Sequence, residues 1–258
     1  MLRFPNPGSD IDSFIRIYKE LFASLHSYES FSLDDMSNIL VEKNLATSSG
    51  YMGQEALARS NREDRSRDPL YNQSKMYAEL YRTLGWFHSK EESSLNYEMT
   101  YLGQHVFSSK FNISEIFKQC ILGISYPNPN LEVKNNHFLR PFKTILRTMM
   151  HLDGVLSRDE MILGPLSMIN DRDEIEFQDM INLIKSIRGN KKKLNSKFAA
   201  LSQELKIQKN TMRNYTRFPI AVLTWTEWTE KVKNKEIYNS SMPFLKLTDG
   251  GVALTSDR

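Results

Sequence analysis

The strongest constraint on the fold is an order of predicted elements that occurs twice along the sequence. The first half begins with segments in which apolar residues recur every three to four positions, the spacing of a helix with one buried face. A long helix is expected over 69–84, because Pro69 favours the first helical turn, and Gly85 ends it. The other elements expected in this half are helices over 10–26, 32–43 and 50–60, strands over 86–88 and 97–101, and a helix that starts at 102.

The second half repeats this order. Ser157 and Glu160 have the spacing of a capping box, in which each side chain satisfies a backbone N–H at the start of a helix. A long helix is expected over 210–224, despite Pro219. The other elements expected in this half are helices over 138–152, 174–187 and 194–205 and strands over 226–233 and 243–247.

Helices followed by a strand hairpin are the order of a winged helix-turn-helix. With 11 Gly and 9 Pro among 258 residues, tight β-turns are few and helix is favoured. The sequence therefore predicts a mainly helical α+β fold with small β-hairpin wings, built as two tandem winged helix-turn-helix subdomains. The expected division is an N-terminal arm at 1–9, subdomains at 10–124 and 138–258, and a connection at 125–137.

Cysteine content and hydropathy indicate the cellular setting. One cysteine, Cys120, excludes an internal disulfide framework and a cysteine-based zinc site, and its apolar neighbours favour a buried structural thiol over a reactive one. No apolar run approaches the ~18 residues of a membrane span, and the first residues lack the apolar region of a signal peptide. We therefore expect a soluble cytoplasmic protein without a membrane partner.

The sequence contains none of several common motifs of catalysis. The five histidines form no HxxxH or HExxH pair, and the motifs GxxxxGK[ST], GxGxxG and GxSxG are absent. A nuclease metal site needs carboxylates that hold a divalent ion and a nearby lysine. The chain has no Pro-Asp, and its acid-x-Lys fragments at 132–134 and 204–206 are of a kind that occurs by chance in a charged chain. No catalytic residue, metal ligand or cofactor is therefore predicted within this chain.

Positive charge is concentrated in one stretch. The segment 188–217 carries nine basic residues and one acidic residue, Glu204, whereas the net charge of the whole chain is +3. Such a distribution is typical of a protein that binds a polyanion, and a solvated helix face would explain it equally well. The lysines of this stretch that suit phosphate or solvent are Lys191, Lys192, Lys193 and Lys197.

Two sets of residues have the chemistry that reads DNA bases. Arginine and lysine pair with O6 and N7 of guanine, and asparagine and glutamine pair with N6 and N7 of adenine. One set consists of Lys209, Asn210, Thr211, Arg213, Asn214 and Arg217. Its asparagines and arginines recur three and four positions apart, so the expected helix carries them on one face.

The other set lies before and within the helix expected at 69–84, and consists of Arg59, Arg62, Arg65, Arg67, Asn72, Gln73 and Lys75. Its last three members fall in the first turns of that helix, the part of a recognition helix that enters the major groove. The arginines could instead form a solvated loop with Glu63, Asp64 and Asp68. Arg3, on the N-terminal arm, is expected to reach a minor groove.

Several segments together resemble a known family. In chain order they are 50–58, the Arg/Asp-rich 62–68, Gly85-Trp86-Phe87, 97–106, 116–127, 138–159 and 214–217. They cover most of the chain and resemble the DNA-recognition half of type IIS restriction and nicking endonucleases of the AlwI kind.

The resemblance implies that two winged-helix subdomains bind double-stranded DNA as a monomer and read a short asymmetric site in the major groove. It also implies that cleavage and Mg²⁺ belong to a separate nuclease domain or subunit, since this chain stops at Arg258 without one. The alternative is a winged-helix transcription regulator or a protein-interaction scaffold. Regulators usually dimerise on palindromes, so the number of chains bound per duplex separates these hypotheses.

Overall fold

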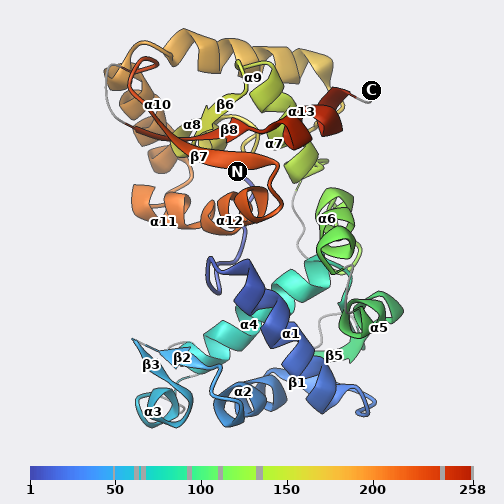
Figure 1. The fold of residues 1–258 in the computed structure, drawn as a ribbon. Coiled ribbons are helices and arrows are strands. Elements are labelled where there is room, and N and C mark those ends of the chain that lie inside the picture. The colour runs from blue at the N-terminus through green and yellow to red at the C-terminus, as the bar shows by residue number, and fades with distance from the viewer. Residues whose placement is uncertain are drawn as a thin grey trace. The chain divides into compact units, whose positions relative to one another are not determined.

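The computed structural model describes residues 1–48, 50–60, 64, 68–91, 95–109, 113–131, 136–238 and 242–256. These residues form an α+β fold in which helices surround small antiparallel sheets, as predicted. None of the described helices is both long and apolar enough to cross a membrane. The chain divides into two compact units (Figure 1). The N-terminal unit consists of Asp10–Ile121 and Asn128–Val133, and the C-terminal unit consists of Met1–Ser9, Leu122–Pro127 and Lys134–Arg258.

The N-terminal unit has one three-stranded sheet and one two-stranded hairpin. The three-stranded sheet has the order β1-β5-β4, and β2 pairs with β3, all antiparallel. The elements are α1 (Ile11–Leu25), β1 (Phe31–Ser32), α2 (Leu33–Glu42), β2 (Thr47–Ser48), β3 (Tyr51–Met52), α3 (Gly53–Ala58), α4 (Pro69–Thr83), β4 (Phe87–Ser89), β5 (Asn96–Met99), α5 (Tyr101–Ser108) and α6 (Ile113–Gly123), the last of which ends in the C-terminal unit.

Capping residues and a first-turn proline define where the helices of this unit begin. Asp10 accepts a hydrogen bond from the backbone N–H of Ser13 and caps α1, and Ser32 forms a capping box with Asp35 at α2. Asp68 caps α4, whose first residue is the expected Pro69. The core behind these helices is aromatic, and the rings of Tyr18, Tyr81, Trp86 and Phe87 lie with centroids 4.7 to 5.7 Å apart.

The hairpin formed by β4 and β5 in the N-terminal unit is closed by one threonine. Thr100 Oγ1 donates a hydrogen bond of 2.6 Å to the carbonyl of Gly85, and its backbone N–H donates one of 3.1 Å to the carbonyl of Trp86. The same hydroxyl accepts from the N–H of Gly103 and thereby caps α5. One side chain thus ties the entry of the hairpin to its exit.

The C-terminal unit has a three-stranded antiparallel sheet with the order β6-β8-β7. Its elements are α7 (Pro141–Met150), β6 (Val155–Ser157), α8 (Arg158–Leu163), α9 (Glu174–Ile187), α10 (Lys191–Glu204), α11 (Lys209–Asn214), α12 (Arg217–Trp225), β7 (Thr229–Asn234), β8 (Met242–Leu247) and α13 (Asp249–Ser256). The predicted capping box of Ser157 and Glu160 is present at the start of α8. The predicted helices and hairpin strands occur in the predicted order, with β6 added and the helix at 210–224 divided, and their assignment as winged helices stays an interpretation.

A threonine closes this second hairpin with the same bonds. Thr248 Oγ1 donates a hydrogen bond of 2.6 Å to the carbonyl of Glu227, and its backbone N–H donates one of 3.1 Å to the carbonyl of Trp228. Its hydroxyl also accepts from the N–H of Gly251. The two units therefore share a local arrangement that their sequences show only as a threonine three residues before a glycine.

The N-terminal arm packs into the C-terminal unit. Leu2 and Phe4 are buried, and the Phe4 ring contacts the rings of Phe142 and Phe218. Arg3 between them is exposed, with its guanidinium 5.8 Å from the ring centre of Tyr215.

The single helix expected over 210–224 was wrong. The chain forms two helices there, α11 and α12, which are separated at Tyr215 and Thr216. Pro219 explains the break, because its ring would clash with the carbonyl four residues earlier, that of Tyr215, in a continuous helix. In the observed structure Pro219 is the third residue of α12, where a missing N–H leaves no bond unmade.

Other helix boundaries differ from the prediction as well. The helix expected at 50–60 begins only at Gly53, because Tyr51 and Met52 pair with β2. Helix α10 begins at Lys191 instead of residue 194, because Asn190 caps it by accepting from the N–H of Lys193 at 3.0 Å. The lysines at 191–193 therefore occupy a helical turn.

Candidate nucleic-acid interface

The two units differ strongly in charge. The N-terminal unit contains 12 basic and 17 acidic residues, a net charge of −5, whereas the C-terminal unit contains 22 basic and 14 acidic residues, a net charge of +8. Net charge therefore favours the C-terminal unit as the part that attracts a polyanion.

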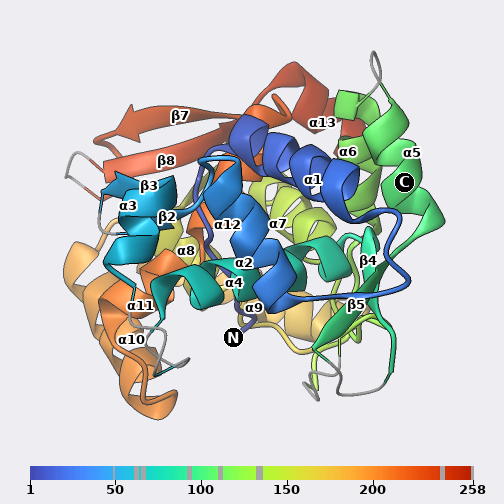
Figure 2. The ribbon, with the colours of Figure 1, turned by 90° about the horizontal axis from the view of Figure 1, so that it is seen from below.

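Three helices of the C-terminal unit pack against one another beneath its basic surface. Buried Ile162, Phe198 and Met212 join α8, α10 and α11 in one apolar cluster. Figures 1 and 2 show α10 and α11 side by side, joined by the short turn 205–208 in which Lys206 has a positive φ of 53°. The predicted binding residues that are exposed on these helices are Lys191, Lys192, Lys193, Lys197, Lys209, Asn210 and Asn214, whereas Thr211 is half-buried.

The first turn of α10 holds three successive lysines at the positive end of the helix. Cations there oppose the helix dipole, so Lys191, Lys192 and Lys193 weaken the stability of α10. Lys193 lessens this cost by donating from Nζ to the carbonyl of Ser186 at 3.0 Å. A negatively charged ligand would be favoured at this helix end.

Three arginines gather where α8, α11 and α12 meet. Partial desolvation lowers the pKa of the Arg158 guanidinium, and the positive charges of Arg217 and Arg213 lower it further, while Asp159 raises it. Arg158 and Arg217 are exposed and are the first residues of α8 and α12. We call Arg158, Arg213 and Arg217 the arginine cluster.

Asp159 holds one member of the cluster. Arg213 donates from Nε to Asp159 Oδ1 at 2.9 Å and from Nη2 to Oδ2 at 2.6 Å, and this bond raises the pKa of Arg213. The sequence interpretation missed both Arg158 and Asp159. The available signal was a basic residue directly after the capping serine, in a first turn where acids are favoured.

The four residues expected on one face of one helix do not share a helix. Asn210, Arg213 and Asn214 lie on α11, three and four positions apart, but Arg217 begins α12 beyond the break. The charges of Arg213 and Arg217 both act on Arg158, so these three side chains lie near one another. The tertiary fold, and not one helical face, brings Arg213 and Arg217 close to Arg158.

The residues expected in the N-terminal unit have different surroundings. Gln73 is buried, donates from Nε2 to Thr47 Oγ1 and accepts from the Thr47 N–H, both at 3.0 Å, so its side chain joins α4 to β2. Lys75 is exposed and Asn72 is half-buried. The guanidinium carbon of Arg59 lies 3.6 Å from the ring centre of Tyr51. The predicted Arg62, Arg65 and Arg67 lie outside the described residues.

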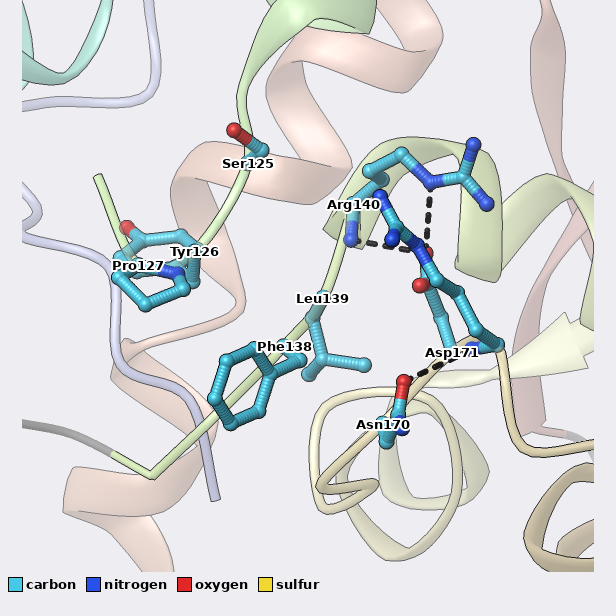
Figure 3. Close-up of a pocket in the computed structure, with 9 residues that line it drawn as sticks. Ser125, Tyr126, Pro127, Phe138, Leu139, Arg140, Asn170 and Asp171 are labelled. Atoms are coloured by element: carbon cyan, nitrogen blue, oxygen red, sulfur yellow. Dashed lines mark hydrogen bonds and ion pairs between the residues drawn. The ribbon is translucent and has the colours of Figure 1, made fainter. Parts of the chain in front are cut away.

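A pocket lies within the C-terminal unit, away from the predicted base-reading residues in sequence (Figure 3). Its lining residues are Ser125, Tyr126, Pro127, Phe138, Leu139, Arg140, Asn170, Asp171 and Arg172. Asp171 is buried and accepts from both the backbone N–H and Nε of Arg140 at 2.9 Å. Its carboxylate therefore holds Arg140 at the start of α7. Among the described residues, no group of three or more His, Cys, Asp or Glu could hold a metal ion.

Comparison with known proteins gives a structural likeness and no sequence match. No family model and no curated protein sequence matches the chain. Among solved structures, the restriction endonuclease FokI is similar at 14% sequence identity and a TM-score of 0.47. The alignment covers 99% of this chain and 47% of the FokI chain, so the present sequence spans about half the length of that structure.

Proposed function

We propose that this chain binds double-stranded DNA sequence-specifically, as the recognition part of a restriction endonuclease of the type IIS kind. The arginine cluster is the observation that carries the proposal. Gathered guanidinium groups repel one another, and a phosphate backbone would relieve that repulsion.

The remaining basic residues extend this surface over α10 and α11. Lys191, Lys192, Lys193, Lys197 and Lys209 are exposed on these helices and would contact phosphates. Asn210 and Asn214 are exposed one turn apart on α11, where their amides would pair with adenine edges in the major groove. Phosphate contacts would position the protein, and α11 would read the sequence.

Cleavage would belong to a nuclease domain or subunit outside these residues, which would use Mg²⁺. The opposite net charges of the two units suit an asymmetric site bound by one chain, because equal halves would favour a symmetric one. A dimer on a palindrome would instead favour a transcription regulator. Hydrodynamic mass with and without a selected duplex measures which stoichiometry holds.

The test begins with selection of binding sites from a random duplex library, followed by fluorescence titrations at several salt concentrations. If about six phosphates are neutralised, the slope of log affinity against log salt should be near −5. Replacing both Arg158 and Arg217 by alanine should make the slope shallower by about two units. Arg172→Ala, an exposed arginine of the same unit outside the cluster, is the control and should change it little. Salt-independent binding, or equal effects of the three substitutions, would contradict the proposal.

A further inference from the structure

Arg213 is held in one orientation by two neighbours. Its Nε and Nη2 atoms bind the two oxygens of Asp159, and its guanidinium carbon lies 5.1 Å from the ring centre of Phe198. The Asp159 side chain is 8% exposed, whereas that of Arg213 is 38% exposed. The acid is thus inside the protein and the arginine opens to solvent.

The turn that carries Asp159 is itself rigidly held. Its neighbour Glu160 is fully buried and accepts hydrogen bonds from the Ser157 N–H, from Nε of Arg188 and from the hydroxyl of Tyr238, at 2.7 to 2.9 Å. A carboxylate placed on such a turn has little freedom to move. Groups that must hold a partner at a fixed geometry need this kind of support.

The bond to Asp159 leaves one particular edge of the guanidinium available. A guanidinium has five N–H donors, and Asp159 takes the edge formed by Nε and Nη2. The remaining edge, formed by Nη1 and the second hydrogen of Nη2, offers two adjacent donors. Guanine presents two adjacent acceptors, O6 and N7, in the major groove.

The ion pair with Asp159 also makes Arg213 differ from the other two arginines in its effective charge. Asp159 balances the charge of Arg213, whereas no acidic side chain among the described residues forms an ion pair with Arg158 or Arg217. Phosphate attraction is set by net charge, and base recognition is set by the direction of donors. The cluster therefore contains two kinds of arginine.

We infer that Asp159 is a positioning residue that directs Arg213 toward one guanine, while Arg158 and Arg217 bind the phosphate backbone. This inference rests on the proposed function and deepens it, since it assigns different binding roles to the arginines of one surface. A positioning acid on a DNA-binding surface has a cost, because it repels phosphate.

The decisive variant is Asp159→Asn, which removes the charge and keeps the size. Titrations would use the selected duplex, its single-base variants and a scrambled duplex at about 0.1 M salt. We expect affinity for the scrambled duplex to rise roughly two- to eightfold, because a repelling charge is lost. We expect discrimination at one G·C pair to fall by roughly 5- to 150-fold, because Arg213 is no longer directed. The two changes have opposite signs, which a loss of structure would not produce.

Arg213→Lys is the second variant, because Asp159 is buried and its substitution could unfold α8. Lysine keeps the charge of residue 213 but lacks the planar fork. This variant should lower discrimination at the same base pair and leave the dependence of affinity on salt unchanged. Circular dichroism checks the folding of both variants, and an unfolded Asp159→Asn variant leaves Arg213→Lys to decide.

The outcomes separate this inference from the proposed function. If the wild-type chain shows no salt-dependent binding to duplex DNA, the proposed function fails. If the wild type binds and discriminates but both variants retain its discrimination, only the positioning role of Asp159 is overturned. An equal loss of affinity for every duplex with both variants would also overturn it, since Asp159 and Arg213 would then serve structure alone.

Discussion

The N-terminal and C-terminal units build their hairpins alike and differ in the charge around them. In each unit a short strand ends in a serine with a capping box, Ser32 in one and Ser157 in the other. In each unit the short strand pairs with the second strand of the hairpin, and a threonine closes that hairpin. Yet the net charges are −5 and +8. Backbone arrangement and surface charge are thus set by different residues.

The residue that follows the capping serine illustrates the difference. In the N-terminal unit it is Leu33, which is 1% exposed, and in the C-terminal unit it is Arg158, which is exposed and belongs to the arginine cluster. The same place at a helix start serves the core in one unit and the surface in the other. A shared fold therefore does not assign a shared function to both units.

Placing the residue type of one unit at the matching position of the other should give the largest change in stability. Leu33→Arg should destabilise the N-terminal unit by roughly 3 kcal/mol, because it buries a charge without a partner. Arg158→Leu should change the free energy of unfolding by less than about 0.5 kcal/mol, because the position is exposed, and should weaken DNA binding. Denaturant unfolding and duplex titrations measure the two quantities. Tolerance of Leu33→Arg would mean that the two positions are equivalent after all.

Alanine substitution of the glycine that follows each closing threonine should lower stability by a similar amount in both units. A Cβ at Gly103 would lie 2.5 Å from the Trp86 carbonyl oxygen, and a Cβ at Gly251 would collide with that of Trp228. Gly103→Ala and Gly251→Ala should each cost about 1–3 kcal/mol, because backbone atoms must shift. Gly123→Ala is the control, since nothing lies within 4 Å of its Cβ position. Thermal unfolding of the three variants measures the cost, and a loss in only one unit would limit the shared closure to that unit.

The capping boxes should contribute a smaller and similar amount. Ser32→Ala and Ser157→Ala each remove the side chain that accepts from the third helical N–H, which costs about 1 kcal/mol. Threonine at either position keeps that acceptor and should restore most of the loss. The midpoints of denaturant unfolding report both changes. If Ser157→Ala costs no more than a surface substitution, the start of α8 does not depend on its cap.

The smallest expected difference lies in the pH dependence of stability. Burial raises the pKa of Glu79 in the N-terminal unit, so the folded form binds the proton more tightly and acidification from pH 7 toward 4.5 favours folding there. Burial lowers the pKa of His137 in the C-terminal unit, so the unfolded form binds the proton more tightly and stability falls below about pH 6.5.

Glu79→Gln and His137→Asn should remove these opposite contributions. The free energy of unfolding of each variant is compared with the wild type between pH 4.5 and 7, so that other titrating groups cancel. The difference curves should slope in opposite directions. Parallel curves would mean that the two units respond to pH in the same way.

Elements with short-range signals could be predicted from the sequence. Helix α9 has the predicted bounds, and α1, α2 and α4 begin within one residue of the predicted starts, because the signals at a helix start involve residues only two or three positions apart. Strands β1 and β6 were not predicted as strands. They contain two and three residues and exist because they pair with β5 and β8, which lie far along the chain.

The candidate site was predicted only in part. The basic stretch at 188–217 and the polar residues of α11 were visible as composition and spacing. Arg158 and Asp159 were not, because Asp159 lies 54 positions from Arg213 and no periodicity links them. Gln73 was expected at an interface, and it is instead buried against Thr47, 26 positions away.

The sequence by itself determined where charge, caps and helix-breaking residues lie, and with them the α+β class and the basic character of the second half. It does so because capping, proline geometry and net charge depend on neighbouring residues or on composition. The tertiary structure alone decided that α8, α11 and α12 bring three arginines together and that Asp159 holds one of them. Burial and long-range contacts set the direction and the partner of a side chain, and neither is written in local spacing.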